Sequence, residues 1–338
     1  MPTRRSFLRT AAAVSVAAIG GRYLTGCSSS SSSEIVLYTS VDQPVAAKIV
    51  ASFEKDHAGA KVRLVADTEA SKSVGLATRL RAEKANPVCH VWWGNEVFHT
   101  VGLSGEGLFA PLSLPVLGEI APQFKDEQGR WAGSGLRARV LVVNDAAGPT
   151  KGSLDDLLDP RFKNKVGLAR PLAGTTGGHV AALYALWGEK KADDFFRGLK
   201  ANGAIMLGGN SAVAEQVGAS NLLIGLTDND DVFAAQRNGG EIWQVLPDQS
   251  PDQIGTLAIP TTVALVKRDD RPPAASTLAA FLLSDRCERM LLDENFAAYS
   301  VRESAPDRPK TMNVRFEEVA RLMGTAPKRA ADIVDGRV

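Results

Sequence analysis

From Glu34 onward, short apolar runs alternate with segments in which apolar and polar residues recur at helical spacing. The apolar runs at 35–38, 62–65 and 88–92 are short and have the composition of buried strands. Residues 43–55, between the first two runs, carry apolar side chains at helical spacing. Strands that alternate with amphipathic helices are typical of βαβ units, so the pattern predicts an α/β protein with a largely parallel sheet.

Two longer extended runs, at 136–144 and 255–266, enclose a second series of short strands and helices. We interpret them as the strands by which the chain leaves one domain and later returns to it. The sequence therefore predicts two lobes and a helical tail: lobe 1 from 34–138 and 262–310, lobe 2 from 139–261, and the tail over 311–338.

Several predicted strands end in a polar residue directly before a helix. In open α/β sheets, ligands bind outside the carboxyl ends of the strands. By position alone, the candidate binding residues of the first lobe are Ser40, Thr68, Glu69, Asn95 and Glu96.

The N-terminal residues have the pattern of an export signal. Arg4 and Arg5 precede an apolar run at 11–19, and no acidic residue occurs before Glu34. This run is too short to span a hydrocarbon core of about 30 Å, which argues against a membrane-spanning helix. We predict a twin-arginine signal peptide over residues 1–26.

The residues that follow predict attachment to a membrane surface. The stretch Leu-Thr-Gly-Cys that ends at Cys27 resembles the lipobox of bacterial lipoproteins. Acyl chains on Cys27 would anchor the protein at the cell envelope without a spanning helix. The serines at 28–33 cannot form a packed core, so residues 27–33 are expected to be a tether.

Charge and cysteine content exclude several classes of protein. The chain has 338 residues, with 39 Lys and Arg against 38 Asp and Glu. Removal of residues 1–26 takes away four arginines and leaves 35 basic against 38 acidic residues, so nucleic acid is not an expected partner. Cys89 and Cys287 lie in apolar contexts, and we expect buried thiols rather than a disulfide.

Four segments together resemble ABC-transporter solute-binding lipoproteins of the type II periplasmic-binding-protein fold, in the branch of ferric-ion-binding proteins. They are residues 36–40, 67–69, 155–167 and 259–266. The resemblance implies two lobes, each a mixed sheet flanked by helices, with a ligand cleft between them. It also implies that the crossing strands act as a hinge. Members of this branch bind a hard cation, often together with a small anion.

The resemblance assigns an anion-binding turn to Thr175, Thr176 and Gly177, and a further polar contact to Asn210. Free N–H groups at a helix start and threonine hydroxyls also suit an oxyanion on physical grounds. The alternative is that Thr175 or Thr176 only caps its helix, and that Asn210 has a similar structural role.

The sequence departs from the family at the acidic stretch Asp228, Asn229, Asp230 and Asp231. Iron-binding members carry two adjacent tyrosines where Asp230 and Asp231 stand here. Carboxylates are also ligands for hard cations, but they could equally pair with an ammonium group or stabilise a helix start. Glu96 matches a family carboxylate on the opposite lobe, so the predicted metal ligands are Glu96, Asp230 and Asp231.

Arg137 and Arg139 are two apart on a predicted strand and therefore share one face. One of them could hold a phosphate, phosphonate or carboxylate of the ligand, and Arg139 is the candidate. The alternative is an ion pair with neighbouring acids at the hinge. No residue matches the family's histidine ligand, and the four histidines are interpreted as surface or packed side chains.

We therefore predict the receptor of an ABC importer, which captures a small charged solute such as Fe(III) or another hard cation, with no required cofactor. One alternative is an organic solute that bears amine and phosphonate or phosphate groups. A carboxylate-based hydrolase is the alternative of another class, although the motifs of serine hydrolases, zinc proteases and phosphate loops are absent. The expected partners are a permease and the membrane, and the expected state is a monomer.

Overall fold

The computed structural model describes residues 34–67, 74–172, 174–302 and 308–338. The predicted signal peptide, Cys27, the tether, Thr68 and Glu69 lie outside the described residues.

The first lobe is built on one half of a mixed sheet. Its strands follow the order β2-β1-β3-β10-β5, in which β1 is parallel to β2 and β3, and β10 is antiparallel to β3, β4 and β5. The strands are β1 (Glu34–Thr39), β2 (Lys61–Ala66), β3 (Val91–Gly94), β4 (Phe109–Ala110), β5 (Trp131–Asn144) and β10 (Ala258–Val266).

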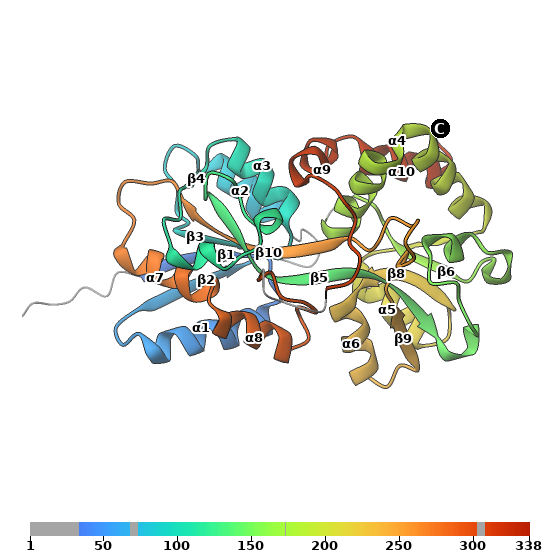
Figure 1. Ribbon diagram of the computed structural model, residues 1–338, viewed down its shortest axis with the longest axis horizontal. Coiled ribbons are helices and arrows are strands. Elements are labelled where there is room, and N and C mark those ends of the chain that lie inside the picture. Colours follow the sequence, from blue (N-terminus) through green and yellow to red (C-terminus); the bar gives the residue numbers. More distant parts are fainter. Residues whose placement is uncertain (1–33, 68–73, 173, 303–307) are drawn as a thin grey trace, which may run out of the picture. The chain divides into compact units, whose positions relative to one another are not determined.

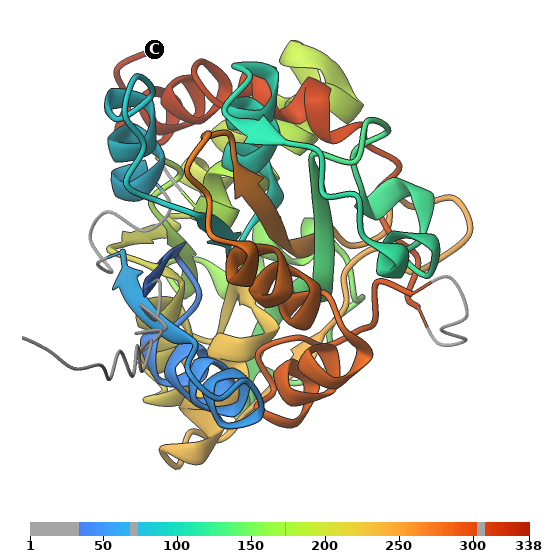
Figure 2. The ribbon, with the colours of Figure 1, turned by 90° about the vertical axis from the view of Figure 1, so that its left-hand side faces the viewer.

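Helices cover this half of the sheet with apolar faces. The helices are α1 (Gln43–Asp56), α2 (Val74–Ala82), α3 (Val97–Gly105), α7 (Pro273–Leu282) and α8 (Asp285–Asp293). In α1, the predicted face of Ile49, Val50 and Phe53 is buried together with Ala46, whereas Val45 is half-buried. Helix α8 packs against both α1 and α7, which face the reader in Figure 2.

The second lobe continues the sheet through β5. Its order is β5-β8-β6-β7, with β9 also paired to β5; β6 is parallel to β7 and β8, whereas β5 is antiparallel to β8 and β9. The elements are β6 (Val166–Ala169), α4 (Gly174–Ala201), β7 (Ile205–Leu207), α5 (Asn210–Gly218), β8 (Ile224–Asp228), α6 (Asn229–Arg237) and β9 (Ile242–Val245). Helix α4 consists of two helices that meet at Gly188, whose φ of 75° is non-helical.

Short 3-10 helices connect the larger elements. They are η2 (Pro115–Gly118), η3 (Pro122–Phe124), η4 (Asp145–Ala147), η5 (Leu154–Leu158) and η6 (Pro160–Phe162). The Asp-Asp-Leu-Leu motif that carried part of the family resemblance forms η5, where Ser153 and Asp156 make a capping box.

Strand β5 passes from one lobe to the other. It pairs with β10 up to Ala138 and with β8 from Arg139 onward. The Thr256 hydroxyl, just before β10, donates to the carbonyl of Arg139 at this point. The predicted lobe limits of 138/139 and 261/262 stay a prediction, and the change of partner along β5 is in keeping with the first of them.

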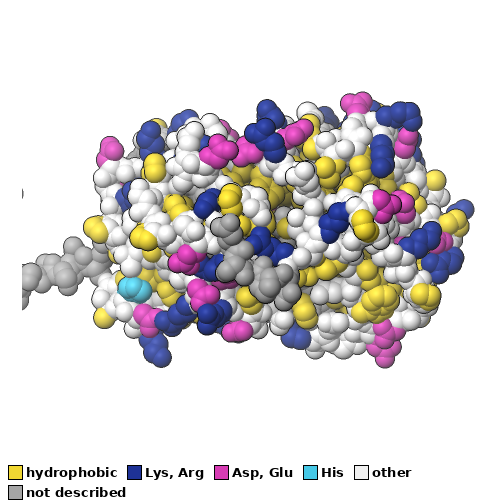
Figure 3. Space-filling view, viewed as in Figure 1, with side chains coloured by type: hydrophobic (Ala, Val, Ile, Leu, Met, Phe, Trp, Pro, Cys, Tyr) yellow, Lys and Arg dark blue, Asp and Glu magenta, His cyan; other side chains and the backbone are white. Residues whose placement is uncertain are grey.

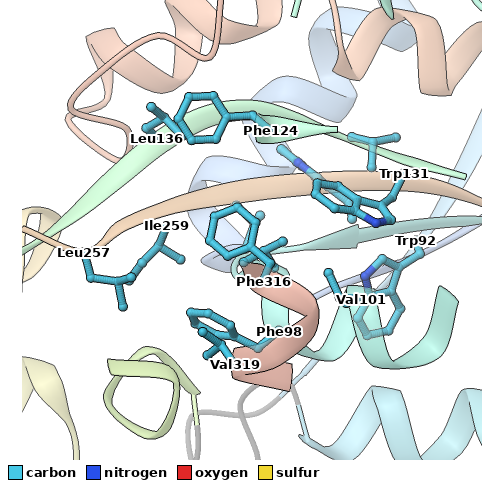
Figure 4. Packing of buried hydrophobic residues seen from close by; sticks show 14 of the residues in the cluster. Trp92, Phe98, Val101, Phe124, Trp131, Leu136, Leu257, Ile259, Phe316 and Val319 are labelled. Carbon is cyan, nitrogen blue, oxygen red and sulfur yellow. The ribbon is translucent and has the colours of Figure 1, made fainter. Parts of the chain in front are cut away.

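The predicted helical tail forms α9 (Phe316–Leu322) and α10 (Ala326–Asp335). Helix α9 packs against α3 and α4, and α10 packs along α4 (Figure 1). Phe316 lies between Phe98 and Trp131, with ring centroids 6.1 and 6.5 Å apart, and Val319 lies beside Phe98 (Figure 4). The tail therefore contacts both lobes through apolar side chains.

Three features bear on the wider predictions. Cys89 and Cys287 are buried free thiols, which confirms that they do not pair. Among the described residues, no helix is long and apolar enough to cross a membrane. Basic and acidic side chains are interspersed on the face shown in Figure 3, with no large field of one sign.

Candidate functional site

A cavity of about 280 Å³ lies where α4, α5 and α6 begin. Lobe 2 supplies most of its wall, Arg137 on β5 adds to it, and Asn95 comes from lobe 1. The lining residues are Asn95, Arg137, Ala169, Arg170, Leu172, Gly174, Thr175, Thr176, Gly208, Gly209, Asn210, Ser211, Asp228, Asp230 and Asp231. A larger cavity of about 690 Å³ lies beside α9 and the 122–130 segment, away from this convergence of helix starts.

Asp228 at the end of β8 is the centre of a buried polar network. Its side chain accepts from Arg139 Nη1 at 2.8 Å and from the Thr175 hydroxyl at 2.6 Å. Arg137 Nη1 and Asn210 Nδ2 add contacts of 3.2 Å each. Burial raises the pKa of Asp228, but the two arginines and the Thr175 hydroxyl outweigh this and hold it below its usual range. Asp228 is therefore a carboxylate at neutral pH.

Arg139 is fully buried and serves this network. Besides Asp228, its guanidinium donates to Asn210 Oδ1 at 3.1 Å and to the carbonyl of Leu226 at 3.3 Å. It is not among the residues that line the cavity. The structure thus shows the ion-pair alternative for Arg139 and gives no support to its predicted contact with a ligand anion.

Arg137 contacts residues of both lobes. Its Nη1 lies 3.2 Å from Asp228 Oδ2 and from Asp230 Oδ2, and its Nη2 donates to the carbonyl of Asn95 at 2.8 Å. Burial lowers the pKa of Arg137, but Asp230 and Asp228 raise it more, so the side chain stays charged. Within the described residues, its buried Nε has no hydrogen-bond partner.

The starts of α4 and α5 both lie at the cavity. Gly174 begins α4 with a φ of 59°, a conformation that favours glycine. Helix α5 begins after Gly209 and has no side-chain cap, so its first N–H groups are available to a solute. A Cβ at Gly208 or Gly209 would meet no neighbouring atom, so packing does not require glycine there and the backbone is open to the cavity.

The threonines of the predicted anion turn are tied to neighbouring side chains. The Thr175 hydroxyl donates to Asp228, and the Thr176 hydroxyl donates to Asn210 Oδ1 at 2.8 Å. Both residues line the cavity, whereas Gly177 lies under Met323 and Pro327 of the tail. The turn is therefore present, but Gly177 is not part of the cavity wall.

The acidic stretch lies at the start of α6. One carboxylate oxygen from each of Asp228, Asp230 and Asp231 lies within 4.8 Å of the others, a spacing that could hold a cation. Asp231 also accepts from the Thr227 hydroxyl at 2.9 Å and from the N–H of Asp228 at 3.4 Å. Asp231 thus stabilises the start of α6 as well as lining the cavity.

Glu96 has a different environment from the one predicted. It is fully buried as the N-cap of α3, where its Oε2 accepts from the N–H groups of Phe98 and His99 at 2.6 and 3.2 Å. Its Oε1 contacts His99 Nδ1 at 2.8 Å. Neither the cavity wall nor the acidic cluster includes Glu96, so this geometry does not support Glu96 as a metal ligand.

Ser40 supports the same turn of lobe 1. Its hydroxyl contacts Asn95 Oδ1 and accepts from the N–H of Asn95, both at 2.9 Å. Ser40 is buried and positions Asn95, which reaches the cavity while Ser40 does not.

The structure therefore brings seven of the predicted residues together in the cavity wall. The wall does not include Ser40, Glu96, Arg139 or Gly177. The seven are Asn95, Thr175, Thr176, Asn210, Asp228, Asp230 and Asp231. Sequence reasoning left out the Gly208 and Gly209 turn and Arg170. A pair of glycines after a short strand and before a helix is a usable signal for an anion-binding turn.

Comparison with known proteins defines the class. Residues 102–320 match the family described as "Bacterial extracellular solute-binding protein", and the chain belongs to this family. Its members bind small solutes, work with ABC permeases and are not enzymes, so the hydrolase alternative is set aside.

Individual relatives are consistent with this assignment. The chain is 29% identical over 289 residues to an Fe(3+)-binding periplasmic protein of Serratia marcescens, covering 83% of this chain and 82% of that protein. It resembles iron-bound HitA from Pseudomonas aeruginosa, with a TM-score of 0.76 and 23% identity over 88% of this chain and 99% of the other. AfuA from Actinobacillus pleuropneumoniae, with fructose-6-phosphate bound, has a TM-score of 0.71 and 20% identity over 90% and 97% of the two chains. The predicted two-lobed periplasmic-binding-protein fold is confirmed.

Proposed function

We propose that this protein is the receptor of an ABC importer for a small charged solute that binds at the starts of α4, α5 and α6. The observation that carries the proposal is the 280 Å³ cavity, whose wall combines the uncapped start of α5 with a cluster of carboxylates. Helix starts attract anionic oxygens, and carboxylates attract cations. The wall therefore suits a solute that carries both kinds of charge.

The first candidate solute is a ferric ion or another hard cation, accompanied by a small anion. Asp228, Asp230 and Asp231 would supply oxygen ligands, and the starts of α4 and α5 would hold the anion. The similar proteins from Serratia marcescens and Pseudomonas aeruginosa bind iron, which supports this candidate.

The second candidate is an organic solute with amine and phosphonate or phosphate groups. Two observations favour it. Aspartates stand where iron-binding relatives are expected to have tyrosines, and Arg137 already balances part of the acidic charge. The similar AfuA binds a sugar phosphate, so this fold accommodates such a solute.

The proposed mechanism of capture is closure of the two lobes around the solute. A solute that contacts lobe 2 and also Asn95 of lobe 1 binds the closed form better than an open one, and so shifts the population toward closure. The strands β5 and β10 connect the lobes and would bend in this movement. The permease would then recognise the closed form.

The place of action follows from the N-terminal sequence. We propose export by the twin-arginine route, lipid attachment at Cys27 and action as a monomer at the cell envelope. Metabolic labelling with a fatty acid would test the anchor, because a Cys27→Ala variant should lose the label while the wild type keeps it.

The solute is identified by native mass spectrometry and metal analysis of freshly purified protein. We expect a bound small molecule or ion that is lost in Asp230→Asn, because Asp230 lines the cavity. Asp194→Asn is the matched control, since Asp194 is an exposed aspartate of lobe 2 outside the cavity. A solute retained equally by all three proteins would refute the proposed site.

A further inference from the structure

Arg137 has the surroundings of a bound cation. Three oxygens lie within 3.2 Å of its terminal nitrogens: Asp228 Oδ2, Asp230 Oδ2 and the carbonyl of Asn95. Two come from lobe 2 and one from lobe 1. Carboxylate and carbonyl oxygens arranged in this way are also the ligands that a hard cation prefers.

The charge of the cluster depends on this guanidinium. Asp228, Asp230 and Asp231 face two buried arginines, and Arg139 is directed to Asp228 Oδ1. Within the part of the chain that the structure describes, Arg137 reaches Asp230 and Asp228 Oδ2 together. A cation that entered this cluster would meet the positive charge of Arg137 at close range, where the attraction and repulsion of charges are little screened.

A purely structural role explains Arg137 incompletely. Its guanidinium lies over the Phe296 ring, 5.1 Å from the centroid, which adds stability. However, its Nε has no partner within the described residues, although the side chain is 3% exposed and lines the cavity. Among these residues the buried Nε of Arg139 is unpartnered too, so the feature that distinguishes Arg137 is that it lines the cavity while Arg139 does not.

We propose that the guanidinium of Arg137 is a built-in competitor of cationic ligands, so that it sets the charge preference of the cavity. It lowers the affinity for a cation and raises the affinity for an oxyanion. A cation that binds has to displace it from Asp230, which breaks an ion pair between the lobes, and also from the Asn95 carbonyl. This inference rests on the proposed function, because it concerns the same cavity.

The test uses terbium(III) alone and inorganic phosphate alone as probes of the mature protein and its Arg137→Met variant. Met has a similar length and no charge. We expect the variant to bind terbium(III) at least tenfold more tightly, measured by luminescence, and phosphate at least threefold more weakly, measured by calorimetry. The opposite signs matter, because general damage to the cavity would weaken both.

Arg137→Lys is the matched control, since it keeps the charge and should retain the preference of the wild type. Arg137→Gln is the second neutral variant, because its amide can still donate to the Asn95 carbonyl. Terbium(III) affinity that is equal or weaker in a folded neutral variant overturns the proposal. Failure of both neutral variants to fold also overturns it, since Arg137 would then be a structural residue.

The result is separable from failure of the proposed function. If the wild type carries no solute and Asp230→Asn has no effect, the proposed site is wrong. If the wild type and Asp230→Asn behave as expected while Arg137→Met leaves both probes unchanged, only the inference about Arg137 is wrong.

Discussion

The turns before α3 and α6 place a buried carboxylate at similar positions in the two lobes. Glu96 follows β3, Asp228 ends β8, and each is the N-cap residue of the next helix with at most 1% exposure. Glu96 is satisfied by its own helix and by His99, three residues away. Asp228 is satisfied by Arg137, Arg139 and Thr175, which are distant in sequence. One carboxylate is therefore a local cap, and the other joins three elements.

The comparison teaches that position at a strand end does not decide the role of a carboxylate. A buried charge requires partners, and the tertiary structure determines whether these are local or distant. Where they are distant, the charge also fixes the cavity wall. The following predictions test this distinction.

The largest effect is expected for Asp228→Asn. The substitution removes the charge that compensates two buried arginines, and breaking a buried ion pair typically costs about 3–5 kcal/mol. Denaturant unfolding measures the loss. A decrease of less than about 1 kcal/mol in the free energy of unfolding would show that Asp228 contributes no more to stability than a local helix cap.

A smaller loss of stability is expected for Gly178→Val. A Cβ at Gly178 of α4 would overlap the ring of Phe98, which lies two residues after Glu96 in α3. Overpacking of this kind costs about 1–3 kcal/mol, and the added side chain should hold the lobes apart. We expect weaker solute binding and a larger radius of gyration by solution scattering.

Gly105→Ala is the control for Gly178→Val, because a Cβ at Gly105 meets no neighbouring atom. Unchanged scattering and unchanged binding in Gly178→Val would contradict a direct contact between α3 and α4 through Phe98.

A pH dependence is expected at Glu96. Burial raises its pKa, but His99 and the backbone donors outweigh this and lower it. Burial lowers the pKa of His99, and Glu96 outweighs this and raises it. The pair therefore contributes fully to the stability of the protein between pH values of about 4.5 and 6.5, the usual pKa values of glutamate and histidine. Stability should decrease when the pH rises through the raised pKa of His99. It should also decrease when the pH drops through the lowered pKa of Glu96.

Glu96→Gln should remove this pH dependence and cost about 1–2 kcal/mol at pH 6, the scale of a lost cap and charged hydrogen bond. Unfolding curves at pH 5, 6 and 8 measure it. Solute affinity should stay within about twofold, since Glu96 does not line the cavity. A large loss of affinity in a stable variant would restore Glu96 as a ligand.

The smallest effect is expected for Arg170→Ala, which should change the affinity for the solute rather than the stability of the fold. Arg170 lines the cavity, but it is exposed and paired with Asp335 of α10. Exposed ion pairs contribute little to stability. We expect a decrease of about two- to fivefold in affinity for an anionic solute at low salt, and less at 0.5 M salt, because exposed charges are screened. Calorimetry at both salt concentrations is the measurement.

Much of the fold was predictable from local pattern. Helical spacing of apolar residues marked α1, a continuous apolar run marked the strand at 35–38, and the long extended runs marked β5 and β10. The expectation of a largely parallel sheet was only partly correct, because β5, β9 and β10 run antiparallel to their neighbours. Strand direction depends on pairing between residues far apart in sequence, which periodicity does not contain.

The candidate site was predictable in part. The acidic stretch at 228–231 and the threonines at 175 and 176 were visible as polar residues at helix starts, and the structure places both in one cavity wall. Arg137 and Arg139 were visible as two charges on one strand face, but the sequence left their partners open. The structure pairs both with Asp228, and only Arg137 lines the cavity.

The sequence by itself determined which segments form helices and strands and which residue types stand at their ends, because these depend on the spacing and chemistry of neighbouring residues. The tertiary structure alone decided that Glu96 caps a helix while Asp228 joins two arginines to the wall of a cavity. The physical reason is that a buried charge is neutralised by whatever lies within a few ångströms, and for Asp228 the charged partners are arginines of β5, which is distant in sequence.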